Sequence, residues 1–383
     1  MSVIKKLTIL QRFTYAVLLF LLIASCSGIS KATDIFVKPT AREVYLRNLE
    51  SPQLLELWEE QAELALQDSV SVRLPYSETG QFLPKTFPVY SYEVAVNPGE
   101  QLLVEIETDT SATLVFLDLY KQEMDSVVSF EHIESADFES KLLEAEISSP
   151  GIYKVVVQPE IESHTAFNLS IRTQPVYEFP VVSKGNSAIQ SYWGARRDGG
   201  RRSHEGIDIF APRGTPVVAT TSGRISRTGD RGLGGKQVWL RDSERGLSLY
   251  YAHLDSIIAT PGMKVSPGDT LGLVGNTGNA KTTPPHLHFG IYKGFSGAIN
   301  PLPYVFQPEE PKPQQKPLKL LSENVFVSAR TANLRMGPST KSPVLTQIQP
   351  QDTLRVLGKT DSWYHIRNRN KASFIHESLV KAL

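Results

Sequence analysis

The histidines of this chain are concentrated in one part of the sequence. Four of the eight stand between residues 204 and 288: His204, His253, His286 and His288. His286 and His288 are one residue apart in "PHLHFGIY", so in a strand both imidazoles project from the same face. Two imidazoles on one face indicate a metal site, an acid–base site, or both.

A carboxylate completes a possible set of metal ligands. In "SHEGIDIFAP", His204 and Asp208 are four residues apart, but Gly206 and the β-rich "IDIF" argue against a helix. A turn that leads into a strand would aim both side chains inward. A catalytic zinc ion keeps three protein ligands at ~2.0–2.2 Å and one open position. One zinc site would therefore leave two imidazoles for proton transfer and transition-state stabilisation.

The order of the motifs resembles that of LytM/lysostaphin-type zinc endopeptidases, which hydrolyse peptidoglycan. The resemblance rests on "SHEGIDIFAPRGTPVVA", "GRIS", "YYAHL", "VSPGDTLGLVGNTGN" and "PHLHFGIY". It implies one zinc ion bound by His204, Asp208 and His288, and catalysis by His253 and His286. No ligand or catalytic position is substituted. The implied substrates are the stem peptides of peptidoglycan.

Two other functions stay open at this point. The chain could be a non-catalytic wall-binding activator of another wall hydrolase, although the complete ligand set argues against it. It could also be a structural lipoprotein that only bridges wall and membrane. Four arginines in "GARRDGGRRSH" precede the first ligand, and they either pair with carboxylates of a stem peptide or form a solvated loop. They are Arg196, Arg197, Arg201 and Arg202.

The N-terminus is typical of an export signal. A basic segment with Lys5, Lys6 and Arg12 precedes a short apolar core, and residues 1–25 are predicted to be a signal peptide. The ending "IASC" resembles a bacterial lipobox. That resemblance implies cleavage before Cys26, acylation of this cysteine, and an exported protein anchored in an envelope membrane, at the outer membrane or the periplasmic face. The alternative is an ordinary signal peptide with a stray cysteine.

The composition excludes several other classes. Basic and acidic residues number 40 each, so no net charge favours a nucleic-acid partner. Cys26 is the only cysteine, which rules out an intrachain disulfide and a multi-cysteine zinc site.

The elements that must position the site are mainly β. Short strands separated by turn signals predict a β-sandwich. The resemblance above implies an antiparallel β-sheet peptidase domain with an open groove. "ANLRMGPS" and "LRVLGKTDSWYHIR" resemble a bacterial SH3 domain, a small barrel in which Ala372 and Phe374 replace the usual glycine and tryptophan. We expect this barrel to bind wall peptides or to position the enzyme, and to be dispensable for chemistry.

The predicted domain order follows the chain. It runs from the signal peptide (1–25) through a tether with short helices (26–70), the β-sandwich (71–175), the peptidase domain (176–306) and a proline-rich linker (307–323) to the SH3 domain (324–383).

Overall fold

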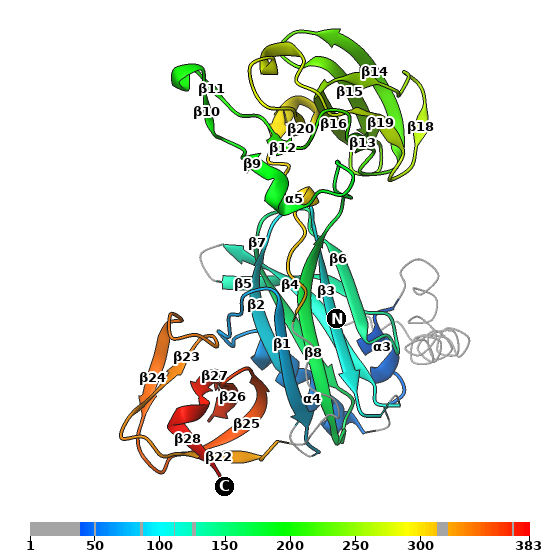
Figure 1. The fold of residues 1–383 in the computed structure, drawn as a ribbon. Coiled ribbons are helices and arrows are strands. Elements are labelled where there is room, and N and C mark those ends of the chain that lie inside the picture. Colours follow the sequence, from blue (N-terminus) through cyan, green and yellow to red (C-terminus); the bar gives the residue numbers. More distant parts are fainter. Residues whose placement is uncertain are drawn as a thin grey trace, which may run out of the picture.

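The computed structural model describes residues 39–49, 51–84, 87–110, 112–124, 128–311, 321–369 and 371–383. Figure 1 shows three β-rich lobes, with the predicted sandwich in the middle. The region predicted to be the peptidase domain (176–306, here the peptidase lobe) lies at the top, and the region predicted to be the SH3 domain (324–383, here the SH3 lobe) lies below. The predicted signal peptide and Cys26 lie outside the described residues. Within the described ranges, no helix is both long and apolar enough to cross a membrane.

Among the described residues, two short helices precede the first strand, as predicted: α3 (Ala41–Leu46) and α4 (Pro52–Ala65). Ser51 is the N-cap of α4 and Pro52 occupies the first helical position. Trp58 of α4 is buried and donates its indole N–H to the carbonyl oxygen of Pro159 at 2.9 Å. This contact fixes α4 on the sandwich.

The sandwich consists of two sheets that share one core. Its first sheet has the order β1 (Tyr76–Phe82), β8 (Thr165–Pro175), β3 (Glu100–Thr108), β6 (Leu142–Glu146). Its second sheet has the order β2 (Tyr90–Val96), β7 (Gly151–Pro159), β4 (Val115–Met124), β5 (Val128–Ser135). Val104, Leu117 and Val155 come from three of these strands and are all buried in the shared core.

The SH3 lobe continues the first sheet of the sandwich. Its strands are β22 (Asn324–Val327), β23 (Ala332–Arg335), β24 (Val344–Ile348), β25 (Thr353–Thr360), β26 (Trp363–Asn368), β27 (Lys371–His376) and β28 (Val380–Ala382), with a 3₁₀ turn, η5 (Glu377–Leu379). β25 pairs with β1, so that the described strands form one 11-stranded sheet.

The SH3 lobe therefore packs directly against the sandwich. Leu357, Ala372 and Phe374 belong to the same buried cluster as the sandwich core. Gly358 allows the close approach, since a Cβ there would lie 1.9 Å from a carboxylate oxygen of Glu78. Ala372 and Phe374, where the sequence departs from the SH3 pattern, are among the residues that pack against the sandwich.

The peptidase lobe is built on a curved main sheet. Its order is β18 (Lys264–Val265), β14 (Gly223–Arg231), β15 (Gly235–Asp242), β16 (Leu247–Leu254), β20 (His286–Tyr292), β12 (Ile207–Phe210), β9 (Ile189–Ser191), and β21 (Ala298–Ile299) pairs with β20. A second sheet has the order β13 (Pro216–Val218), β19 (Thr270–Leu273), β17 (Ser256–Ile257).

Short elements connect these strands. They are the hairpin β10 (Arg196–Arg197) and β11 (Arg202–Ser203), the helix α5 (Leu302–Val305), and the 3₁₀ turns η1 (Asn186–Ala188), η2 (Asp198–Gly200), η3 (Gly278–Ala280) and η4 (Gly294–Ser296).

The peptidase lobe rests on one end of the sandwich. Arg245 donates two hydrogen bonds to Glu146 of β6, at 2.7 and 2.8 Å. The backbone N–H of Val176 donates to the carbonyl oxygen of Gly99 at 3.0 Å. The buried core of the peptidase lobe is nevertheless its own, since its members all lie between Tyr177 and Val305.

Candidate active site

Strand pairing brings the predicted zinc ligands together. β12 and β20 are antiparallel neighbours, and Asp208 stands directly opposite His288. Ile207 and Ile209 flank Asp208 and are fully buried in the core, so strand alternation turns Asp208 to the other face of the sheet. His204 precedes β12, and its backbone N–H donates to the carbonyl oxygen of Ala195 at 2.9 Å.

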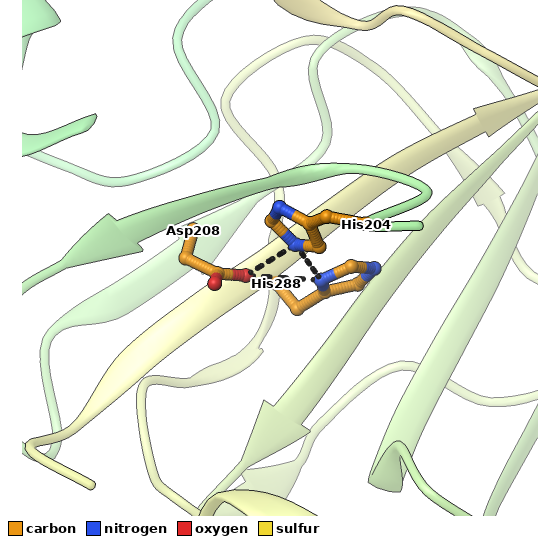
Figure 2. Close-up of side chains that lie close together, drawn as sticks. All are labelled: His204, Asp208 and His288. Atoms are coloured by element: carbon orange, nitrogen blue, oxygen red, sulfur yellow. Dashed lines mark hydrogen bonds and ion pairs between the residues drawn. The ribbon is translucent and has the colours of Figure 1, made fainter. Parts of the chain in front are cut away.

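The three donor atoms form a compact triangle (Figure 2). His204 Nε2 lies 3.0 Å from Asp208 Oδ1 and 3.0 Å from His288 Nδ1. The third side, from His288 Nδ1 to Asp208 Oδ1, is also 3.0 Å. Ligand atoms around a tetrahedral zinc ion with bonds of ~2.0 Å stand roughly 3.3 Å apart, so the triangle has about the size that zinc requires.

The surrounding hydrogen bonds favour a cation between these atoms. His204 Nδ1 lies 2.9 Å from the carbonyl oxygen of Tyr192, which can only accept, so Nδ1 carries the proton. When the ring is neutral, its Nε2 presents a lone pair to the carboxylate oxygen of Asp208. Two acceptors at 3.0 Å repel each other unless a proton or a metal ion lies between them. The donor set therefore fits a metal ion.

The two predicted catalytic histidines lie beside this triangle. The ring centres of His253 and His286 are 5.1 Å apart, and those of His253 and His288 are 5.8 Å apart. His253 Nδ1 lies 2.9 Å from the carbonyl oxygen of Thr277, and His286 Nδ1 lies 2.9 Å from that of Pro284. Each Nδ1 therefore donates, and Nε2 of each ring, when the ring is neutral, keeps the lone pair that can accept a proton.

His253 has an unusual backbone conformation at the end of β16. Its φ angle is +63°, a conformation that costs a non-glycine residue about 1–3 kcal/mol. Its backbone N–H donates to the carbonyl oxygen of Gly234 at 2.8 Å, and its ring is held by Thr277. Such strain persists where neighbouring contacts fix a functional residue.

All five side chains line one open cleft of about 870 Å³. Trp239, Tyr250 and Tyr292 form an aromatic wall, with Trp239 ring-centre distances of 4.5 Å to Tyr250 and 5.1 Å to Tyr292. Tyr251 is fully buried instead. Strand alternation turns Tyr250 and Tyr251 to opposite faces of β16, so only Tyr250 of the two lines the cleft.

Comparison with known families agrees with this geometry. Residues 202–301 match the family described as Peptidase family M23, and residues 330–381 match the Bacterial SH3 domain. Residues 202–301 form an M23 peptidase domain. The M23 family is one of metallopeptidases, and both family resemblances predicted from the sequence are confirmed.

Several curated proteins are similar to part of this chain. An L-Ala--D-Glu endopeptidase of Bacillus subtilis is 39% identical over 125 residues, which are 30% of this chain and 38% of that protein. The peptidoglycan DD-endopeptidase ShyC of Vibrio cholerae is 34% identical over 97 residues, 24% of this chain and 22% of ShyC. The uncharacterized lipoprotein YgeR of Escherichia coli is 36% identical over 119 residues, 30% of this chain and 43% of YgeR.

The chain spans less than half the length of each of these relatives. Among solved structures, it is similar to the catalytic domain of lysostaphin from Staphylococcus simulans. That similarity has 33% identity and a TM-score of 0.27, and it covers 30% of this chain and 87% of the lysostaphin chain.

Gly206 of the M23 domain leaves space for one of the predicted ligands. A Cβ at this position would lie 2.8 Å from Nε2 of His288 and 2.6 Å from the carbonyl oxygen of Phe289. The sequence indicated only that Gly206 disfavours a helix. The structure shows that any side chain here would displace the ring of His288.

Burial and close neighbours shift the pKa values in the M23 site. Burial raises the pKa of the Asp208 carboxyl, but the neighbouring imidazoles of His204 and His288 outweigh it and hold this pKa well below its usual range. Burial lowers the pKa of His288, against the opposing influence of Asp208. Burial, together with His288 and His286, lowers the pKa of His253 to about 4. The His253 ring is therefore neutral at neutral pH.

Sequence reasoning missed several contacts of the site. Arg197 donates from Nη2 to Asp208 Oδ2 at 2.7 Å. The sequence suggested only that the arginines pair with substrate carboxylates or form a solvated loop, so this partner was not predicted. Backbone acceptors were also missed, because no residue type or spacing marks them. They are the carbonyl oxygens of Tyr192, Thr277 and Pro284.

Proposed function

We propose that this chain is a zinc-dependent endopeptidase that hydrolyses peptide bonds of peptidoglycan. The observation that carries the proposal is the triangle of His204, Asp208 and His288 beside two further imidazoles in an open cleft. Two relatives are named as peptidoglycan DD-endopeptidase and L-Ala--D-Glu endopeptidase, which supports the substrate class. The two names denote different bonds, so the products of the reaction decide which bond is cut.

The residues of the site have different proposed roles in the reaction. His204, Asp208 and His288 would hold the zinc ion. Bound zinc supplies a Lewis acid that polarises a carbonyl group and acidifies water. His286 accepts a proton at Nε2, because its Nδ1–H already donates a hydrogen bond to the carbonyl oxygen of Pro284.

The tautomer of neutral His253 determines whether this side chain can donate or accept a hydrogen bond in the reaction. The sequence left two imidazoles for proton transfer and transition-state stabilisation, and the second role requires a hydrogen-bond donor to the developing oxyanion. Because Nδ1–H is donated to Thr277, neutral His253 offers a lone pair at Nε2. His253 therefore becomes a donor at this atom only after it has taken up a proton. The two imidazoles would act in succession as acceptors and donors.

Mass spectrometry of the products from purified wall fragments tests the proposed reaction. We expect new peptide termini at one type of bond in the stem or cross-link, and no product after a chelator has removed the metal. If purified protein binds zinc but leaves the wall intact, the activator function replaces the enzyme.

Single variants test the assignment of the histidines. His288→Ala should lose most bound zinc and all measurable turnover, because only two protein donors remain. His286→Ala should keep near-stoichiometric zinc while turnover falls ~10²–10⁴-fold, and His253→Ala should behave like it. His132→Ala is the matched control, since this histidine lies in the sandwich strand β5. If His286→Ala loses zinc and His288→Ala retains it, the two assignments are reversed.

We also propose that the enzyme is exported and anchored by acyl chains on Cys26, facing the wall from the outer membrane or the periplasmic side. The support is "LLIASC" after a basic segment, together with a relative that is named a lipoprotein. Each buried CH₂ of an acyl chain contributes ~0.8 kcal/mol to membrane attachment. Cys26→Ala should therefore move the protein from the membrane fraction to the soluble fraction. Equal membrane attachment of the variant would refute acylation at this site.

A further inference from the structure

The hairpin β10–β11 carries an arginine that contacts the proposed metal site. Arg197 lies seven residues before His204 and outside residues 202–301, the segment that matches the M23 family. Its Nη2 lies 2.7 Å from Asp208 Oδ2 and 2.6 Å from Ser191 Oγ. Its side chain is 36% exposed, whereas that of Asp208 is 10% exposed.

The carboxylate of Asp208 is divided between two sets of partners. Oδ1 faces His204 Nε2 and His288 Nδ1, both at 3.0 Å. Oδ2 faces the guanidinium of Arg197. A carboxylate that gives one oxygen to a metal ion is oriented by the hydrogen bond to its other oxygen.

We propose that Arg197 is a positioning residue for Asp208: it holds Oδ2 so that Oδ1 stays in the triangle of metal ligands. This inference rests on the zinc site proposed above. Because the ion pair is partly exposed, its Coulomb energy is small. Its effect is orientation, since a planar guanidinium fixes the direction of a carboxylate better than a flexible ammonium group.

Ser191 ties this contact to the rest of the site. It pairs with Asp208 across β9 and β12, and its hydroxyl lies 3.3 Å from His204 Nδ1. Arg197 therefore contacts the side chains of both residues in that strand pair. A shift of the guanidinium would free Asp208 to rotate away from the two histidines.

Recognition of a substrate carboxylate is the competing role for Arg197. The two roles differ in what the variant changes. A substrate-binding arginine affects KM and leaves zinc affinity unchanged. A positioning arginine weakens zinc binding, even when no substrate is present.

The experiment measures the zinc affinity of the metal-free full-length chain by competition with a chromophoric chelator. Arg197→Gln should bind zinc 10–100-fold more weakly than the unaltered chain, the range typical for loss of a residue that orients a metal ligand. Arg197→Lys should recover part of the loss, because it keeps the charge but not the planar geometry. Arg196→Gln, on the exposed side of the same hairpin, is the matched control and should bind like the unaltered chain.

The circular dichroism spectra of the metal-free variants report whether they fold. If folded Arg197→Gln binds zinc as tightly as the unaltered chain, the inference is overturned, and an accompanying rise in KM would assign Arg197 to the substrate instead. If the unaltered chain itself binds no zinc, the proposed function is overturned, and this inference falls with it.

Discussion

Glu78 and His365 form a hydrogen-bonded pair inside the protein although 287 positions separate them. His365 Nδ1 lies 3.0 Å from Glu78 Oε1, and both side chains are completely buried. Glu78 belongs to β1 of the sandwich, and His365 belongs to β26 of the SH3 lobe. The hydroxyls of Tyr76 and Tyr92 also donate to this carboxylate. The pair therefore joins the two lobes through polar contacts within a shared apolar core.

Removing one member of this pair should cost more than replacing both. Glu78→Leu leaves His365 and two tyrosine hydroxyls without their acceptor, and we expect a loss of about 3–5 kcal/mol in the free energy of unfolding. The double variant Glu78→Leu/His365→Leu should cost clearly less than the sum of the two single variants. Denaturant unfolding measures all three. Glu377→Gln, which breaks a partly exposed pair with Lys359, is the control and should cost less than about 1 kcal/mol. Strict additivity of the two single variants would contradict the proposed coupling.

Removal of the SH3 lobe should destabilise the sandwich core and leave the core of the peptidase lobe unaffected. A chain that ends at Glu309 loses Leu357, Ala372 and Phe374 from the sandwich core. We expect the amides of β1 to lose protection from hydrogen exchange, because their core and their β25 neighbour are gone. The amides of β12 and β20 should keep their protection, and turnover of a small soluble peptide should persist. Unchanged protection in β1 would show that the sandwich does not depend on the SH3 lobe.

This truncation also changes how a loss of activity on intact walls is interpreted. The sequence hypothesis attributes such a loss to missing targeting by the SH3 domain. Because Phe374 packs into the sandwich, the same loss also follows from a disturbed sandwich. A variant of an exposed SH3 residue separates the two explanations. Leu345→Ser on β24, where Leu345 is 43% exposed, leaves the shared core intact. If it lowers activity on walls but not on a soluble peptide, it supports targeting.

The sequence predicted those parts of the site that follow from strand geometry. His286 and His288 lie on the cleft side of β20 because side chains two apart in a strand share a face. The pairing of β1 with β25 could not be predicted, since neither the residue pattern of β1 nor that of β25 specifies a partner strand so distant in sequence. The tautomers of His253 and His286 could not be predicted either. Each depends on a backbone carbonyl oxygen, which every residue carries.

Gly206→Ala should disturb the metal site without removing a ligand. The added Cβ would lie 2.7 Å from Cε1 of His288 and 2.6 Å from a backbone oxygen of β20, so the ring must move. We expect weaker zinc binding and lower turnover. Gly229→Ala is the matched control, because a Cβ at Gly229 meets no atom within 4 Å. Competition with a chelator measures both variants, and equal affinities would show that the site adapts to the added methyl group.

Removing the metal should destabilise the M23 domain alone. The side chains of His204, Asp208 and His288 are at most 15% exposed. Without a cation, the lone pairs of His204 Nε2 and Asp208 Oδ1 face each other at 3.0 Å. Zinc at ~1,000 times its Kd should stabilise the folded domain by about 4 kcal/mol. Calorimetry with and without a chelator should show a zinc-dependent shift in the transition of the M23 domain, whose core is separate from that of the sandwich. Magnesium should not reproduce the shift, because it prefers octahedral oxygen ligands, and His288→Ala should abolish it. A shift of equal size in His288→Ala would place the stabilising ion elsewhere in the protein.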